Sequence, residues 1–422
     1  MHRIPDPRRR GREELSARSA RERLPLAVWI VAVVGFFIAI GFGVMSPVLP
    51  VYARAFGVST FLVGLVVSSL SIVRLASMPL AGSLLTRVGP RELAIAGNLL
   101  LALTTALIGF SNSYAGVLVW RGLGGFGSAL YGVSSMALVF KVVPPHLRGR
   151  ANALTGGGFV LGGMAGPALG GLLSGVSIHF PFFFYAVTLI CAAAVMLVFL
   201  PATQPPTREQ RSASQLTLRA FVRDPRFRAS LAMNFANGWQ SNGVRALVVP
   251  LFVIEVLGQT TAMTGVAFAV AALAQACCLP LTGWAVDHLG RRTMLLAGAS
   301  VTTVIGALVA LAPSFPALVV LLCVYAVGAS AAGSAAQALL ADTVPATAGS
   351  ALSAYQMAGD SGMIVGPLVA GAIIDVASMP VAMGLGSVLF VAAGWLAWRV
   401  PGRTLPPVGS DALEPAPAHG HT

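Results

Sequence analysis

Residues 162–171 read Gly-Gly-Met-Ala-Gly-Pro-Ala-Leu-Gly-Gly, and residues 362–371, 200 positions later, read Gly-Met-Ile-Val-Gly-Pro-Leu-Val-Ala-Gly. The shared positions are Gly162, Gly166, Pro167 and Gly171 in the first copy and Gly362, Gly366, Pro367 and Gly371 in the second, and the first copy adds Gly170. Glycines four residues apart lie on one face of a helix, where a second helix can approach closely, and an internal proline bends the helix. One such stretch would fit an ordinary glycine-rich helix interface, but two copies in register indicate a duplicated fold.

The composition is that of a membrane protein. Of the 422 residues, 56% are hydrophobic and 10% are charged, and the mean hydropathy is +0.82. Soluble domains carry about 25% charged residues. Apolar runs close to the roughly 20 residues that span a bilayer as a helix recur throughout the chain. We therefore expect an all-α membrane protein with twelve transmembrane helices.

The expected helices fall into two sets of six. The first bundle covers 26–200 and the second covers 229–400, with a linker at 201–228 and tails at 1–25 and 401–422. The linker is rich in Pro, Ser, Thr, Gln and Arg, which is typical of a connection between two halves. The expected helices are 26–51, 61–85, 93–110, 115–140, 151–173, 182–200, 229–254, 264–286, 293–312, 317–341, 351–374 and 380–399.

Other glycines and prolines repeat with the same offset. The pairs are Gly43 and Gly243, Pro50 and Pro250, Gly82 and Gly283, and Gly89 and Gly290. Six helices followed by six in the same orientation form a parallel repeat, whose pseudo-two-fold axis lies along the membrane normal. Such repeats place a binding site between the two bundles.

The 27 lysines and arginines are distributed unevenly. Nearly all lie in the tails, the linker and the loops on the same side of the membrane, whereas the opposite side has Arg54 alone. The positive-inside rule then predicts a multi-pass protein of the cytoplasmic (inner or plasma) membrane with both termini in the cytoplasm. The net charge of +13 reflects this topology and attraction to anionic lipid, so no nucleic-acid partner is expected.

A loop between the eighth and ninth expected helices carries the first family resemblance. Residues 283–292 read Gly-Trp-Ala-Val-Asp-His-Leu-Gly-Arg-Arg, and a weaker copy at 82–91 reads Gly-Ser-Leu-Leu-Thr-Arg-Val-Gly-Pro-Arg. The loop resembles the signature cytoplasmic loop of the major facilitator superfamily, and the resemblance covers about 26–400. It implies a cytoplasmic gate that locks the outward-facing state. The gate residues would be Gly82, Arg87, Gly89, Gly283, Asp287, Gly290, Arg291 and Arg292.

The chemistry of this loop leaves alternatives open. Asp287 follows the eighth helix and can pair with Arg291 or cap the ninth helix. An ordinary turn between two helices is the other interpretation. In the weaker copy Thr86 stands where the family has an acid, so the charge pair is not expected there.

Three further stretches resemble exporters of this family. Arg121 with Gly125 resembles the arginine motif of the fourth helix, and residues 162–171 resemble the motif of the drug–proton antiporter branch. Pro-Val-Leu-Pro at 47–50 is similar to the end of the first helix in tetracycline-type exporters. The resemblance implies efflux by proton antiport, with Arg121 acting on a proton site or on substrate. Pairing of Arg121 with helix carbonyls is the alternative.

Asp360 is the acid expected deepest in the membrane. It is the tenth residue of the expected helix 351–374, about 15 Å from its start. A charge at that depth costs about 2.5–3.5 kcal/mol on insertion scales, so it calls for a function or a partner. Asp360 could bind and release a coupling proton, or it could be a hydrogen-bonded structural residue or a substrate counter-ion. The first helix has no Asp or Glu, so uncoupled transport also stays open.

A polar stripe marks the seventh expected helix. Asn234, Asn237, Ser241 and Arg245 follow one another at helical spacing, so they share a face that must avoid lipid. This face could line the pathway or hydrogen-bond a neighbouring helix. Further candidates for the substrate cavity are Arg74, Tyr131, Trp239, Gln240, Gln337, Tyr355 and Gln356.

These patterns predict a monomeric secondary transporter that exports amphipathic, drug-like molecules in exchange for protons. Exporters of sugars or polar metabolites, an uncoupled facilitator and a transport-silent sensor or scaffold are the alternatives. We expect no catalytic residues, cofactor or metal. The chain has no Walker A pattern, which excludes ATP-driven transport by this chain alone, and its four cysteines lie in apolar runs, where they are expected as small apolar residues and not as metal ligands.

Overall fold

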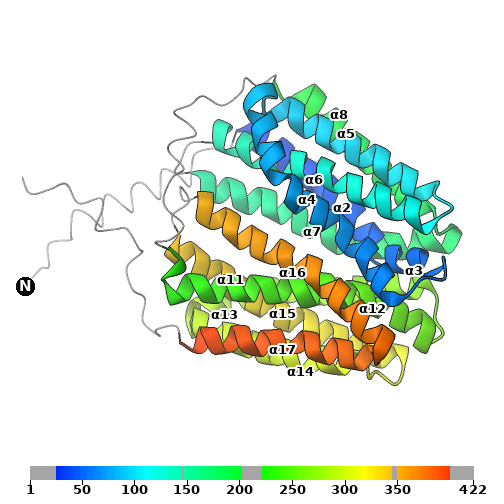
Figure 1. Cartoon of the computed structure of the whole chain (residues 1–422). Helices are drawn as coiled ribbons and strands as arrows, with labels where there is room; N and C mark the ends of the chain where they lie inside the picture. Colours follow the sequence, from blue (N-terminus) through cyan, green and yellow to red (C-terminus); the bar gives the residue numbers. More distant parts are fainter. Residues whose placement is uncertain (1–24, 144–146, 202–220, 345–348, 400–422) are drawn as a thin grey trace, which may run out of the picture.

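The computed structural model describes residues 25–143, 147–201, 221–344 and 349–399, and all regular structure in these ranges is helical (Figure 1). The tails expected at 1–25 and 401–422, except residue 25, and most of the linker lie outside the described residues. The first bundle consists of α2 (Leu26–Met45), α3 (Leu49–Arg54), α4 (Thr60–Val88), α5 (Pro90–Gly109), α6 (Tyr114–Val142), α7 (Arg148–Val176) and α8 (Phe180–Phe199).

The second bundle repeats this plan below the first in Figure 1. It consists of α11 (Pro225–Asn237), η2 (Gly238–Val244), α12 (Arg245–Leu251), η3 (Phe252–Val256), α13 (Thr261–Leu289), α14 (Arg291–Val309), α15 (Phe315–Thr343), α16 (Gly349–Val376) and α17 (Met379–Trp398). Within the described ranges, eleven helices are long and apolar enough to cross a membrane. The twelfth passage is the continuous run from α11 to η3, which alternates between α- and π-helix. The prediction of a twelve-helix all-α membrane fold is confirmed.

Two expected helices differ from the structure. The first was expected to be continuous over 26–51, but α2 ends at Met45 and α3 begins at Leu49, because Pro47 and Pro50 cannot donate helical hydrogen bonds. The seventh was expected as a regular helix over 229–254. Its middle is instead the π-helix η2, a change of register that residue spacing does not reveal.

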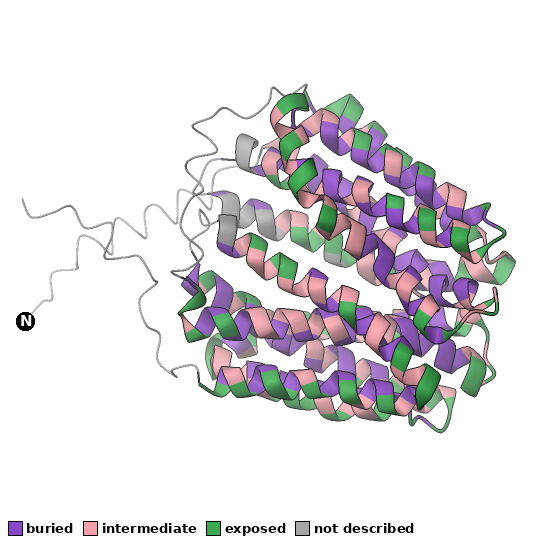
Figure 2. Cartoon of the chain, in the orientation of Figure 1, coloured by how far each residue is buried: buried purple, intermediate pink, exposed green. Residues whose placement is uncertain are grey.

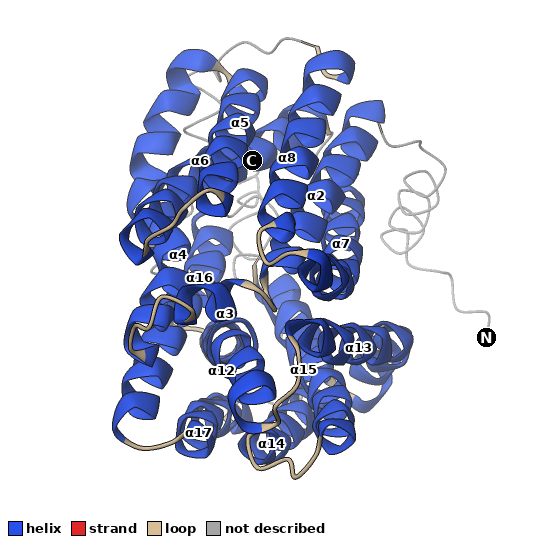
Figure 3. Cartoon of the chain, turned by 90° about the vertical axis from the view of Figure 1, so that its right-hand side faces the viewer, coloured by secondary structure: helices blue, strands red, loops and turns tan. Residues whose placement is uncertain are grey.

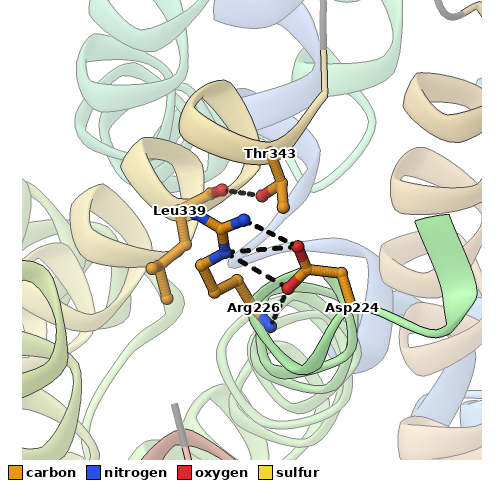
Figure 4. Close-up of polar contacts among 4 residues, drawn as sticks. All are labelled: Asp224, Arg226, Leu339 and Thr343. Carbon is orange, nitrogen blue, oxygen red and sulfur yellow. Dashed lines mark hydrogen bonds and ion pairs between the residues drawn. The ribbon is translucent and has the colours of Figure 1, made fainter. Parts of the chain in front are cut away.

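The seventh passage also begins earlier than expected. Asp224 caps α11 by accepting a hydrogen bond from the backbone N–H of Arg226 at 2.8 Å, and Pro225 starts the helix. The Asp224 carboxylate also pairs with the Arg226 guanidinium, Oδ2 to Nη2, at 2.8 Å (Figure 4). Both side chains are buried beside α15, where the Thr343 hydroxyl donates to the carbonyl of Leu339. Residues 221–228, which the sequence assigned to the linker, therefore belong to the second bundle.

The terminal face is the end where α2 begins and α17 ends, and the distal face is the opposite end (Figure 1). Figure 3 looks onto the distal face, where α4 lies beside α16 and α7 lies beside α13. These two pairs of helices join the bundles. The bundles expose large apolar side chains, among them Leu172, Leu281 and Val198, as a lipid-facing surface requires. Figure 2 shows exposed positions along the helices of both bundles.

Candidate functional site between the two bundles

The glycine-proline stretch of α7 packs against α2 along its length. A Cβ atom added to Gly162 would clash with the carbonyl of Phe36, and one added to Gly166 would clash with Gly43. Gly170 makes the same kind of contact with the carbonyl of Val44. Only glycine allows two helix backbones to approach this closely.

The second copy of the stretch packs in the same way inside the second bundle. Gly362 lies against the backbone of Phe235, and Gly366 lies against the carbonyl of Trp239. Gly243 faces Gly366 from the other side, as Gly43 faces Gly166 in the first bundle. The first copy thus packs α7 tightly against α2, and the second copy packs α16 tightly against the seventh passage.

The same two helices also contact the opposite bundle. The carbonyl of Pro167 on α7 lies against Gly265 of α13, and the carbonyl of Pro367 on α16 lies against Gly64 of α4. Gly171 touches Gly265 as well. The sequence interpretation missed Gly64 and Gly265, although they follow the offset of 201 that relates Gly82 to Gly283.

Polar groups close the distal face between α4 and α16. Asp375 accepts hydrogen bonds from the backbone N–H groups of Thr60, at 2.7 Å, and Phe61, at 2.8 Å. A carboxylate at a helix N-terminus satisfies free N–H groups and complements the helix dipole. Nearby, Arg54 Nε donates to Glu255 Oε1 at 2.9 Å, which joins α3 to η3.

Deeper in the same interface lie two charged side chains. Ser68 donates to the carbonyl of Ile364 at 2.7 Å, and Arg74 Nη2 lies 3.6 Å from Asp360 Oδ2. Arg74 is midway between Thr60 and Val88, so this ion pair is near the centre of the membrane. The Asp360 side chain is 12% exposed and that of Arg74 is 31% exposed. Buried charges of opposite sign compensate one another when they meet.

Toward the terminal face the bundles separate. On the terminal side of Arg74 and Asp360, no hydrogen bond or ion pair between described residues joins the two bundles. A Cβ added to Gly82 of α4, Gly157 of α7 or Gly283 of α13 would meet no atom within 4 Å. The interface is therefore closed at the distal face and open toward the terminal face.

Arg121 lies inside the first bundle, where Tyr185 of α8 interacts electrostatically with both Arg121 and Arg74. The Arg121 side chain is 5% exposed. Within the described part of the chain, its Nε and Nη1 atoms have no hydrogen-bond partner. The predicted proton-coupling residues Asp360 and Arg121 are thus not in contact, and Arg74 is the partner of Asp360. The signal in the sequence was that both Arg74 and Asp360 are charges in the middle of a membrane helix.

The polar residues of the seventh passage bond largely within the second bundle. The Asn234 side chain donates to the carbonyl of Tyr355 at 2.6 Å, and the Ser241 hydroxyl lies 2.8 Å from that of Tyr325. The Arg245 guanidinium lies over the rings of Phe268, at 5.4 Å, and Tyr325, at 5.5 Å. Because η2 changes the register, these side chains do not form one continuous stripe.

The other cavity candidates are spread over several helices. Gln240 is fully buried and donates to the carbonyl of Met383 at 3.2 Å and to Ser387 at 3.1 Å, so it faces α17. Half-buried side chains are those of Tyr131, Asn237, Trp239 and Tyr355, and exposed ones are those of Gln337 and Gln356. The Nε1 atom of Trp239 is buried without a partner in the described residues.

The two glycines that end the signature loops adopt a conformation that other residues avoid. Gly89 has φ 101° and Gly290 has φ 92°, and they precede α5 and α14. Arg87 is exposed, and Thr86 donates to the carbonyl of Ser83 at 2.7 Å.

The charged residues of the α13–α14 loop are not joined to one another. Arg291 Nε lies 2.5 Å from Asp342 Oδ2 of α15, and Arg292 lies over the ring of Trp398 at 5.9 Å. Asp287 is exposed and, among the described residues, neither pairs with Arg291 nor caps α14. The sequence interpretation missed Asp342 as the partner, because that contact depends on how α14 packs on α15.

Comparison with known proteins gives one family. A sequence profile of the Major Facilitator Superfamily matches residues 31–246 and 231–419. The multidrug resistance protein MdtH of Aeromonas hydrophila is 26% identical over 388 residues, which cover 89% of this chain and 92% of MdtH. The quinolone resistance protein NorA of Staphylococcus aureus (strain MRSA252) is 26% identical over 187 residues, 43% of this chain and 47% of NorA.

Solved structures show the same fold. A bacterial homologue of the human lysosomal transporter Spinster, crystallised in an inward-facing and unoccupied conformation, matches with a TM-score of 0.73 and 15% identity over 89% of this chain and 96% of its own. The nucleoside transporter NupG matches with a TM-score of 0.69 and 13% identity over 89% of this chain and 99% of its own.

Proposed function

Because the chain belongs to the Major Facilitator Superfamily, we propose that it is a secondary transporter that exports amphipathic, drug-like molecules across the cytoplasmic membrane in exchange for protons. The similarity to MdtH and NorA supports drug efflux. With the terminal face in the cytoplasm, as the charge distribution predicts, the described conformation is open to the inside.

The ion pair between Arg74 and Asp360 carries this proposal. It links the two bundles at mid-depth, where an isolated charge is costly. In the empty carrier, separating the bundles at this point would leave both charges uncompensated, so the pair holds the inward-open state. Protonation of Asp360 removes its charge and releases Arg74. A substrate that competes for either side chain has the same effect.

An exchange cycle follows from these two ways of releasing the pair. Substrate enters from the terminal face, separates Arg74 from Asp360 and allows the distal face to open. After substrate leaves, a proton on Asp360 keeps the pair apart while the carrier returns, and its release to the cytoplasm restores the ion pair. The empty, unprotonated carrier does not cross, which is what couples the two fluxes.

The internal bonding of the second bundle favours an amphipathic substrate over a sugar or polar metabolite. Polar recognition needs free donors and acceptors in the pathway, because unsatisfied polar groups of a bound ligand are costly. Asn234, Gln240 and Ser241 already hydrogen-bond within their own bundle. Aromatic side chains such as Trp239 and Tyr355 are half-buried beside them.

The test uses purified protein in liposomes with a pH gradient and a trapped pH-sensitive dye. Lipophilic cations, antibiotics and sugars are added in turn to wild type, to Asp360→Asn and to Glu92→Gln, a control acid at the start of α5. We expect proton flux driven by amphipathic compounds in wild type and Glu92→Gln and none in Asp360→Asn. Substrate movement without proton flux would contradict antiport, and no movement of any compound would favour a sensor or scaffold.

A further inference from the structure

A groove lies on the membrane-facing side of the second bundle, between α16 and α17. Figure 1 shows these two helices on either side of α11. The volume of the groove is about 390 Å³, and α11 contributes Leu231, Ala232 and Phe235 to its lining. Leu389 and Leu396 of α17 line the other wall. Almost all of this lining is apolar, so water gains few hydrogen bonds there.

The groove runs along the membrane normal within one leaflet. Arg228 and Phe235 on α11, like Leu396 and Leu389 on α17, are separated by seven residues, about 10 Å of helix. Half of the hydrocarbon core is about 15 Å thick. The groove therefore extends from the terminal-face end of these helices toward the middle of the bilayer.

Two tryptophans place the end of the groove at the terminal face at the level of the lipid headgroups. Trp395 and Trp398 are exposed near the end of α17, on either side of Leu396. Arg399 lies 3.8 Å from the centre of the Trp395 ring. Exposed tryptophans and arginines at a helix end are typical of the membrane–water interface.

Arg228 supplies a cation at this end of the groove. It is exposed and lines the groove, and its guanidinium has no hydrogen bond or ion pair with another described residue. The nearest acid along the chain, Asp224, is already engaged by Arg226 (Figure 4). Arg228 thus has no counter-charge from this part of the protein.

We propose that the groove binds a single anionic phospholipid of the leaflet on the terminal side, with an acyl chain along Leu231 and Phe235 and the phosphate at Arg228. The bilayer is the medium that this side of the bundle faces, and an apolar groove in it is filled by hydrocarbon. A basic side chain at headgroup level selects lipid of net negative charge. The site is independent of the export function proposed above.

Native mass spectrometry of the purified full chain tests this site. The protein is titrated with phosphatidylglycerol or phosphatidylcholine of identical acyl chains, and with inorganic phosphate alone. We expect one phosphatidylglycerol to bind about fivefold more tightly than phosphatidylcholine, and Arg228→Ala to abolish that preference. Arg223→Ala is the matched control, because Arg223 is exposed at the same end of the bundle but does not line the groove.

A second variant tests the apolar part of the site. Ala232→Trp fills the groove and is expected to remove binding of the first lipid of either kind, while gel filtration and thermal denaturation report that the fold is retained. The proposal is overturned if Arg228→Ala keeps the preference, if Arg223→Ala loses it equally, or if Ala232→Trp binds lipid like wild type. Displacement of phosphatidylglycerol by inorganic phosphate would also overturn it, since the acyl chain would then contribute nothing.

Discussion

The two contacts between the bundles are equivalent by the internal repeat but differ in chemistry. Between α7 and α13, Gly171 and the carbonyl of Pro167 pack on Gly265, and no hydrogen bond or ion pair joins these two helices among the described residues. Between α4 and α16 the same glycine contact recurs at Gly64. There it is accompanied by the Asp375 cap, the Ser68 hydrogen bond and the Arg74–Asp360 pair.

The difference between the two interfaces separates the closing of the distal face from the response to charge. The glycine contacts are present in both copies because both interfaces must close at the distal face. The charges are present in one copy only, since Gly175 and Val160 occupy the positions equivalent to Asp375 and Asp360. The α7–α13 interface is thus a packing contact, whereas the α4–α16 interface also responds to charge.

The largest effect is expected from blocking either glycine contact. Gly64→Leu and Gly265→Leu place a side chain where the backbone of the opposite bundle lies, and overpacking of this kind typically costs about 1–3 kcal/mol or more. We expect both variants to insert and fold but to lose nearly all transport in the liposome assay. Gly163→Leu on α7 is the control, because a Cβ there meets no atom within 4 Å. Normal transport by either interface variant would show that distal closure does not depend on these contacts.

Removing one member of the ion pair should affect stability next most strongly. Arg74→Ala leaves Asp360 uncompensated, and breaking a fully buried pair costs about 3–5 kcal/mol. Because the Arg74 side chain is 31% exposed, water screens the remaining charge and we expect about 1–2 kcal/mol. Thermal denaturation of the single variants and of Arg74→Ala/Asp360→Asn measures the coupling. Additive effects of the two changes would mean that the side chains do not interact.

The Asp375 cap should have a smaller effect. Asp375→Ala removes the acceptor for the N–H groups of Thr60 and Phe61, and loss of a cap typically costs about 0.5–2 kcal/mol. Ala262 lies at the distal end of α13, where its carbonyl faces Gly171 of the first bundle. We expect more frequent opening of the distal face, measured as faster labelling of Ala262→Cys by a maleimide that does not cross the membrane. Glu255→Gln should change the labelling rate less, because the side chains of its ion pair with Arg54 are 34% and 38% exposed and water screens the two charges. Equal rates in wild type and Asp375→Ala would contradict this role.

The smallest effect is expected from giving the α7–α13 interface the missing charge. Gly175→Asp places a carboxylate at the position equivalent to Asp375, near the start of α13, where Thr260 makes no side-chain cap. A Cβ at Gly175 meets no atom within 4 Å. We expect a gain of about 0.5 kcal/mol in the closed distal state, seen as slower labelling of Ala262→Cys. Faster labelling would show that the two interfaces are not equivalent in geometry.

The sequence predicted the fold well because composition and repeated glycines are global signals. Twelve helices and two bundles follow from residues that act wherever they occur in a helix. The break between α2 and α3 was not predicted, although Pro47 and Pro50 mark its place. The sequence did not predict which partners the individual charged residues contact. The pairing of Arg74 with Asp360, and of Arg291 with Asp342, depends on which helices meet in space, and the π-helix η2 depends on packing against α16. The gate and cavity assignments therefore stay predictions.

The central claim is that the charge of Asp360 holds the two bundles in the described conformation through Arg74. The most direct test is the distance between spin labels placed on the two bundles at the distal face, measured by double electron–electron resonance from pH 5 to pH 9 in a variant without the four native cysteines. We predict a closed distal face at high pH, a growing open population as the pH falls, and a distribution in Asp360→Asn that stays at the low-pH form throughout. A pH response that persists unchanged in Asp360→Asn would contradict the account.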